Sequence, residues 1–111
     1  MEVTFKNNKL EKSVTTSSGL RKTYGKALGK KVKLRYEQLL AVETLSDLGD
    51  IRAARLHALT GDRAGEWAVD VSGNDRLCFR LVCDPVPLLP DGGIDLSNVT
   101  SVKIVFIGDY H

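Results

Sequence analysis

The chain has 111 residues, of which 42% are hydrophobic and 27% charged, which suits one globular domain and excludes two. No apolar run approaches the about 20 residues of a membrane-spanning helix, and no basic-then-apolar leader opens the chain, so we expect a cytoplasmic protein without a membrane partner. The formal net charge of +2 is unevenly spread. Residues 1–40 hold ten Lys and Arg against three acids, or +7, and residues 41–111 hold six against eleven, or −5. This basic half is typical of proteins that bind a polyanion, although a solvated lysine-rich helix face explains it equally simply.

The first 50 residues predict one strand and two helices. Glu2–Phe5 alternates polar and apolar side chains, as a short edge strand does. Asn8 begins a first helix, with Glu11 in the capping-box position, and Thr15–Gly19 ends it. A longer helix covers about Tyr24–Val42. Its buried stripe is formed by Leu28, Val32, Tyr36 and Leu39. The rest of its surface is basic and carries Lys26, Lys30, Lys31, Lys33 and Arg35.

From Arg55 onward the hydrophobic period changes to two, which predicts strands. Arg55–Trp67 is typical of a strand, a tight polar turn and the start of the next strand. Gly73–Asp75 then forms a hairpin turn, and a further strand follows from Arg76 to Cys83. The last strand covers 102–107, with Val102, Ile104 and Phe106 on one face and Lys103, Val105 and Ile107 on the other.

These elements predict a single α+β domain over residues 1–111 in the order β-α-α-β-β-β. The sheet is expected to be antiparallel, with two helices packed on one face and a long inserted loop at residues 84–100, which holds all three prolines. The face that meets the helices carries Trp67, Val69, Val71, Leu77, Phe79 and Leu81. The opposite face carries Arg76 and Arg80 and stays in contact with water, so a substrate is expected to lie there.

The two histidines are the side chains best suited to acid/base chemistry. His57 and His111 alone have an unperturbed pKa near neutrality. Asp109 can orient an imidazole, and Tyr110 can stack on a base or donate a proton. Cleavage of RNA without a metal needs a base for the 2′-hydroxyl, an acid for the leaving 5′-oxygen and cations for the phosphorane charge. A lone histidine on a strand is, however, more often a packing residue.

Three arginines supply the planar forks that suit a phosphate: Arg63, Arg76 and Arg80. Arg76 and Arg80 could instead be solvated, or paired with Asp70 across the hairpin. Cys78 and Cys83 are five positions apart on one strand, about 16 Å, which is beyond disulfide reach, so we expect reduced packing residues. Because Cys78, Cys83, His57 and His111 lack paired ligand spacing, no zinc site is expected.

The run RLHALTGDRAGEWAVDVSGNDRLCF and the terminal DYH resemble the HigB-type killer-protein branch of the RelE/ParE toxin superfamily. The resemblance spans nearly the whole chain and implies a small cytoplasmic toxin of a type II toxin–antitoxin pair. It further implies a metal-independent endoribonuclease that needs no cofactor, cleaves mRNA on the ribosome and so inhibits translation. The implied partners are the ribosome, mRNA and a co-encoded antitoxin, expected to be a helix-turn-helix protein, with operator DNA contacted only through that antitoxin.

Carried over by position, the resemblance implies a catalytic set of His57, Arg76, Asp109, Tyr110 and His111. The expected RNA- and phosphate-binding residues are Arg63, Arg80, Lys30, Lys31 and Lys33. Thr60 stands where these toxins often have a lysine, which removes one phosphate cation. That departure favours the alternative, a non-catalytic member of a toxin–antitoxin pair whose sheet face binds protein or DNA. A gyrase-poisoning role, as in the ParE branch, would leave the histidine pair without a purpose.

Overall fold

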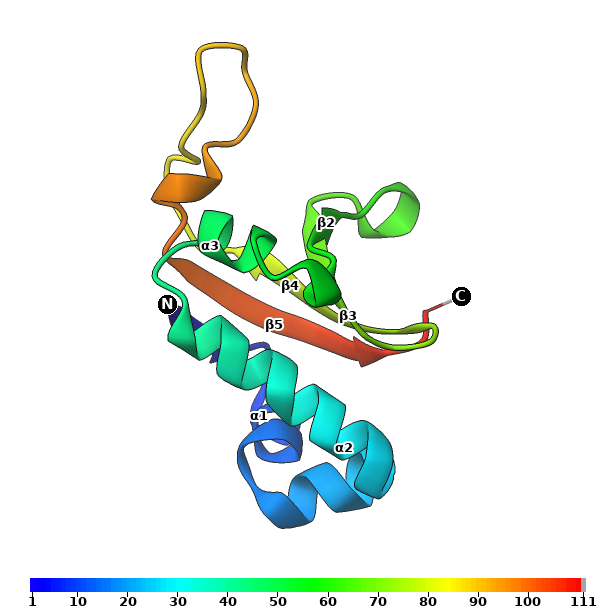
Figure 1. The fold of residues 1–111 in the computed structure, drawn as a ribbon. Helices are drawn as coiled ribbons and strands as arrows, with labels where there is room; N and C mark the ends of the chain where they lie inside the picture. Colours follow the sequence, from blue (N-terminus) through cyan, green and yellow to red (C-terminus); the bar gives the residue numbers. More distant parts are fainter. Residues whose placement is uncertain (111) are drawn as a thin grey trace.

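The computed structural model describes residues 1–110 and shows one five-stranded sheet with the helices gathered on one of its faces (Figure 1). The predicted α+β class is confirmed. The strand order across the sheet is β1-β5-β4-β3-β2. The strands are β1 (Glu2–Phe5), β2 (His57–Ala58), β3 (Glu66–Ser72), β4 (Asp75–Leu81) and β5 (Ser101–Gly108). The helices are α1 (Asn8–Thr15), α2 (Ser17–Ala41) and α3 (Leu45–Gly49), with 3-10 turns at Arg52–Ala54, Gly61–Arg63 and Leu96–Asn98.

The sheet is mixed, whereas the sequence predicted an antiparallel one. Strands β2 to β5 pair antiparallel as expected, but β1 runs parallel to β5, with Val3 opposite Val102. The chain leaves β1 through α1 and α2 and reaches β5 only at its end. A hairpin therefore does not fix the direction of this pair, and a parallel ladder can form.

Side-chain caps set the helix boundaries. Asn7, one residue before the predicted cap, accepts a hydrogen bond from Leu10 N at 2.8 Å and begins α1. Thr16 begins α2 in the same way, accepting from Gly19 N at 2.9 Å, so the second helix starts well before the predicted Tyr24. Gly25, with φ of 80°, interrupts the helical backbone inside α2, in a conformation that glycine adopts without strain.

Arg35 is a buried linker between α2 and the sheet, although the sequence placed it on a solvated face. Its side chain donates to Asp70 O at 2.6 Å, to Gln38 Oε1 at 2.9 Å and to Ala53 O at 2.9 Å. It therefore ties together α2, strand β3 and the turn that precedes β2. A guanidinium can be buried here because carbonyl oxygens replace the lost water.

The core lies between α2 and the predicted apolar face of the sheet. Val69, Leu77 and Phe79 are fully buried against Val32 and Leu39 of α2, as the sequence pattern predicted. Trp67 and Leu81 are partly buried at the margin of this core. Among residues 1–110, no helix combines the length and the apolar character needed to cross a membrane.

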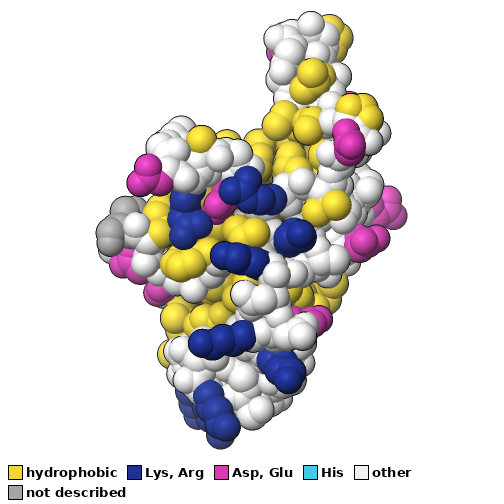
Figure 2. All heavy atoms as spheres, turned by 180° about the vertical axis from the view of Figure 1, so that it is seen from behind, with side chains coloured by type: hydrophobic (Ala, Val, Ile, Leu, Met, Phe, Trp, Pro, Cys, Tyr) yellow, Lys and Arg dark blue, Asp and Glu magenta, His cyan; other side chains and the backbone are white. Residues whose placement is uncertain are grey.

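A bulge in the β4–β5 ladder separates Phe106 from Val102 and Ile104, with which the sequence grouped it on one face. Cys78 pairs with Phe106 but its neighbour Phe79 pairs with Ile104, so Val105 is an extra residue in β5. Phe106 therefore shares a face with Cys78, and Ile107 lies opposite Leu77 on the core side. Figure 2 shows this second face from behind the molecule, with Lys and Arg side chains spread over its middle.

The predicted long loop projects from the end of β4, away from the body of the molecule (Figure 1). It is held by an isolated bridge between Leu88 and Ile94 and by a turn in which Leu89 N donates to Gly93 O at 2.7 Å. Leu88 is 62% exposed. The tip therefore adds little to the core.

Candidate functional site

A cleft of about 830 Å³ opens beside β2 and the turn Gly61–Arg63. We call it the cleft throughout; its lining residues are Arg55, His57, Ala58, Leu59, Thr60, Asp62, Arg63, Glu66, Arg76 and Tyr110. They come from three places in the sequence: the segment around β2, the β3–β4 hairpin and the end of β5. The sheet brings these segments together because β2 pairs with β3 and Arg76 of β4 lies opposite Gly108 of β5.

His57 is held with one ring nitrogen engaged. It lies opposite Ala68 at the edge of the sheet, and its Nδ1 is 2.7 Å from the Arg55 carbonyl oxygen. Because a carbonyl oxygen can only accept, Nδ1 carries the proton, and in the neutral ring the lone pair is on Nε2. Arg55 adopts a left-handed backbone conformation, with φ of 47° and ψ of 59°, that orients this carbonyl. The geometry gives His57 the tautomer of a general base at Nε2.

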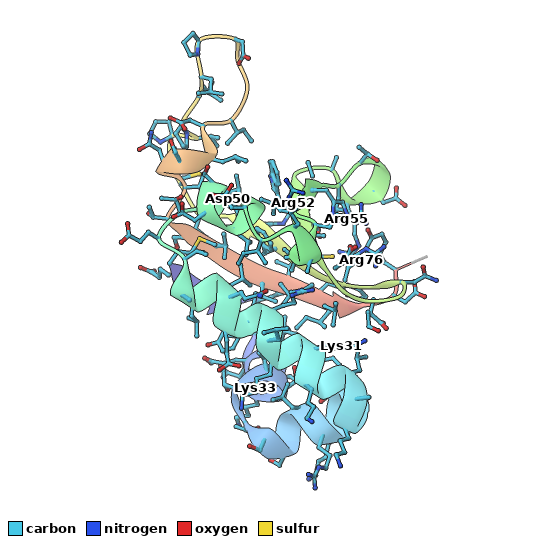
Figure 3. All side chains as sticks on the ribbon, viewed as in Figure 1. Lys31, Lys33, Asp50, Arg52, Arg55 and Arg76 are labelled. Carbon is cyan, nitrogen blue, oxygen red and sulfur yellow. The ribbon has the colours of Figure 1, made fainter. Side chains whose placement is uncertain are left out.

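Asp70 holds two arginines at the cleft. Arg55 forms a bidentate pair with its carboxylate, at 2.6 Å and 3.0 Å, and Arg76 Nε lies 2.9 Å from Asp70 Oδ1. Figure 3 shows Arg55 and Arg76 near each other at this end of the sheet. Partial burial raises the pKa of Asp70, but the hydrogen bond from Arg55 and the charges of Arg76 and Arg55 outweigh it and hold that pKa below its ordinary value.

Glu66 forms salt bridges with two further arginines. It is 7% exposed, and its oxygens lie 2.8 Å from Arg63 Nη1 and 3.4 Å from Arg80 Nη2. The Arg63 guanidinium lies over the ring of Phe106, 4.3 Å from its centroid, and 5.2 Å from that of Tyr110. Phe106 and Tyr110 meet edge to face at 6.3 Å. The carboxylate thus fixes Arg63 above an aromatic pair.

The structure brings together four of the predicted residues, His57, Arg63, Arg76 and Tyr110, at the cleft. Arg80 lines an adjoining hollow, while Lys30 and Lys33 line a separate one on α2; Figure 3 shows Lys33 well away from Arg55 and Arg76. Lys31 donates to Ser72 Oγ at 3.1 Å. Asp109 is exposed, and His111 lies outside the described residues. Their catalytic and binding roles stay predictions.

Three residues of the site were not predicted to act there: Arg55, Glu66 and Asp70. The pair between Arg76 and Asp70, which the sequence left open as an alternative, is present, but Arg80 pairs with Glu66 rather than with Asp70. Glu66 and Arg80 stand directly opposite each other in the β3–β4 ladder, so the register of that hairpin was the signal available in the sequence. Arg55 gave no such signal because its side chain reaches Asp70 from outside the paired strands.

The two cysteines are free thiols, as predicted. Burial raises the pKa of the Cys78 thiol to about 11, so this side chain stays protonated at neutral pH. Within residues 1–110, no three metal-ligating side chains are close enough to hold an ion.

The fold is similar to that of a solved toxin structure. The whole chain superposes on the whole YoeB/ParE toxin from Agrobacterium tumefaciens with a TM-score of 0.54, at 10% sequence identity. In sequence, an alignment 48 residues long, which covers 41% of this chain, shows 33% identity to the endoribonuclease HigB of Proteus vulgaris. That match spans about half of HigB, 52% of its length, and no family model matches the chain. The two similarities confirm the predicted resemblance to toxins of this superfamily.

Proposed function

We propose that this chain is the toxin of a type II toxin–antitoxin pair and acts in the cytoplasm as a metal-independent endoribonuclease on ribosome-bound mRNA. One observation carries the proposal. His57, with its Nε2 available to accept a proton, lines the same cleft as Arg55, Arg63, Arg76 and Tyr110. The similarity to HigB, named an endoribonuclease, supports the same chemistry.

In the proposed reaction His57 Nε2 removes the proton of a 2′-hydroxyl, and the resulting oxygen attacks the adjacent phosphorus. The bond to the 5′-oxygen breaks, and that oxygen takes a proton from Tyr110 or His111. The products are a 2′,3′-cyclic phosphate and a free 5′-hydroxyl. Arg76, which is 12% exposed and already fixed by Asp70, is placed to stabilise the charge on the phosphorane.

A second candidate is the non-catalytic member of such a pair, which binds protein through the same face. It is favoured by the charges of the cleft: Arg55, Arg63 and Arg76 are each bonded to a carboxylate, and Thr60 adds no cation. In this case the arginines are structural, and the cleft has no net affinity for phosphate.

Induction of the wild-type chain in a bacterium, with primer-extension mapping of mRNA ends, separates the two candidates. The nuclease produces new ends within translated codons and arrests growth unless the antitoxin is supplied. His57→Ala should lower the cleavage rate by about 10²–10⁴-fold, because it removes the base. His57→Gln is the matched variant, which keeps a polar side chain without the titratable nitrogen. If the wild-type protein is folded but leaves mRNA intact, the nuclease hypothesis is wrong and the binding-protein hypothesis remains.

A further inference from the structure

The cleft continues across the open face as a groove. A hollow of about 420 Å³ shares Arg63 and Glu66 with the cleft and is also lined by Lys6, Arg80, Lys103, Val105 and Phe106. A further hollow, of about 410 Å³, shares Lys6, Val105 and Phe106 with that one and extends it to Leu10, Ser13 and Tyr24. We call these two hollows the basic groove. It continues the surface that begins at His57 and extends it to the α1–α2 hairpin.

Lys6 and Lys103 of the basic groove differ from the arginines of the cleft, each of which pairs with a carboxylate. Within residues 1–110, neither Lys6 nor Lys103 forms a salt bridge, and both are exposed. Arg80 is 56% exposed and only 3.4 Å from Glu66, a long contact for an ion pair. Within the described part of the chain, positive charge without a salt-bridged carboxylate therefore lies in the groove, at Lys6 and Lys103, beyond the cleft.

The groove also contains a surface on which a base can stack. The bulge in β5 turns Phe106 to this face, where its ring lines both hollows. The Arg63 guanidinium lies over one face of this ring and is fixed by Glu66, so a base can stack on the planar guanidinium or pack against the exposed part of the ring. Unpaired cations beside an aromatic ring are the combination by which proteins hold single-stranded nucleic acid.

We propose that the basic groove binds the RNA strand that flanks the scissile phosphodiester, with Lys6 and Lys103 on its phosphates and Phe106 against a base. The inference rests on the proposed function for the presence of RNA in the cleft. An acidic protein segment would also suit the lysines, but it would have no need of the aromatic platform. The chain therefore recognises several nucleotides, of which the cleft holds those at the cut.

The test is the affinity of the full chain for single strands of fully 2′-O-methylated RNA, which cannot be cleaved, measured by fluorescence anisotropy. A trinucleotide fills the cleft, and a strand of about ten nucleotides also fills the groove. For the longer strand, Lys6→Ala/Lys103→Ala should lower the slope of log Kd against log salt by about 1.4, since two phosphate contacts are lost. Affinity for the trinucleotide should not change. Phe106→Leu should weaken binding of the longer strand about tenfold.

The matched control is Lys12→Ala/Lys22→Ala, which removes two exposed lysines that line none of these hollows. If the Lys6→Ala/Lys103→Ala variant has the same salt slope and affinity for RNA as this control, the proposal is wrong. If an acidic peptide then binds the wild-type chain but not this variant, the groove is a protein-binding site instead. Failure of the proposed function gives a different pattern. If the wild-type protein binds the long strand through these lysines but cleaves no mRNA, the groove proposal holds and the nuclease proposal is wrong.

Discussion

Replacement of Arg35 by methionine tests how the sheet is joined to α2. The guanidinium donates to two backbone carbonyls, Asp70 O at 2.6 Å and Ala53 O at 2.9 Å, and is 9% exposed. Methionine keeps most of the apolar packing of the stem but leaves both carbonyls without this donor. A buried carbonyl without a partner costs about 1–3 kcal/mol, so Arg35→Met should lower the free energy of unfolding by about 3 kcal/mol.

Urea unfolding, followed by the fluorescence of Trp67, measures this loss. With a slope of about 1.5–2 kcal/mol per molar for a chain of this size, the midpoint should fall by about 1.5–2 M. Lys33→Met, at an exposed position two residues earlier on the same helix, is the control and should change the midpoint little. A loss below about 1 kcal/mol would show that water, rather than Arg35, satisfies these carbonyls, and the linker role would be wrong.

Two further predictions concern the site. The folded pKa of Asp70 lies below its unfolded value of about 3.9, so the carboxylate stabilises the fold above that value and this contribution is lost as pH falls through the folded pKa. Thermal melts should therefore show wild type more stable than Asp70→Asn at pH 7, with the difference shrinking as pH falls below about 3.9; a difference that does not shrink on acidification refutes the linkage. Cys78 should resist alkylation in the native chain at pH 8, because its pKa is about 11, while the partly exposed Cys83 reacts; equal labelling by mass spectrometry would contradict the burial.

The elements with regular periodicity were predictable because local sequence determines them. The alternation in β3 and β4 identified the face that meets the helices, and Val69, Leu77 and Phe79 are fully buried there. The bulge at Val105 was not predictable, because an extra residue in a ladder depends on which partner each strand meets. It places Phe106 on the open face, apart from Val102 and Ile104, with which the alternation had grouped it. One residue of register therefore decides whether the platform beside the cleft exists.

Charged residues were harder to place than apolar ones, because their environment depends on partners distant in sequence. The helical period put Arg35 among solvated cations, yet it binds carbonyls 18 and 35 residues away. Lys30 and Lys33 were expected to bind RNA, and they line a hollow on α2 away from the cleft. By contrast, His57, Arg63 and Arg76 all lie in the run RLHALTGDRAGEWAVDVSGNDRLCF, whose strands follow one another through short turns. All three line the cleft, as the resemblance carried by that run implied.

On the open face of residues 1–110, the salt-bridged arginines suit catalysis and the lysines without salt bridges suit binding of the strand. Asp70 and Glu66 hold Arg55, Arg76 and Arg63 in fixed positions, which favours catalysis because the donors need no reorganisation when charge develops. The same carboxylates offset most of the attraction that the cleft exerts on a phosphate, so a short substrate should bind weakly. Lys6 and Lys103 have no such counter-charge, and affinity for a longer strand should come from them. A protein built in this way would discriminate between nucleic acids by the length of the single strand presented to it.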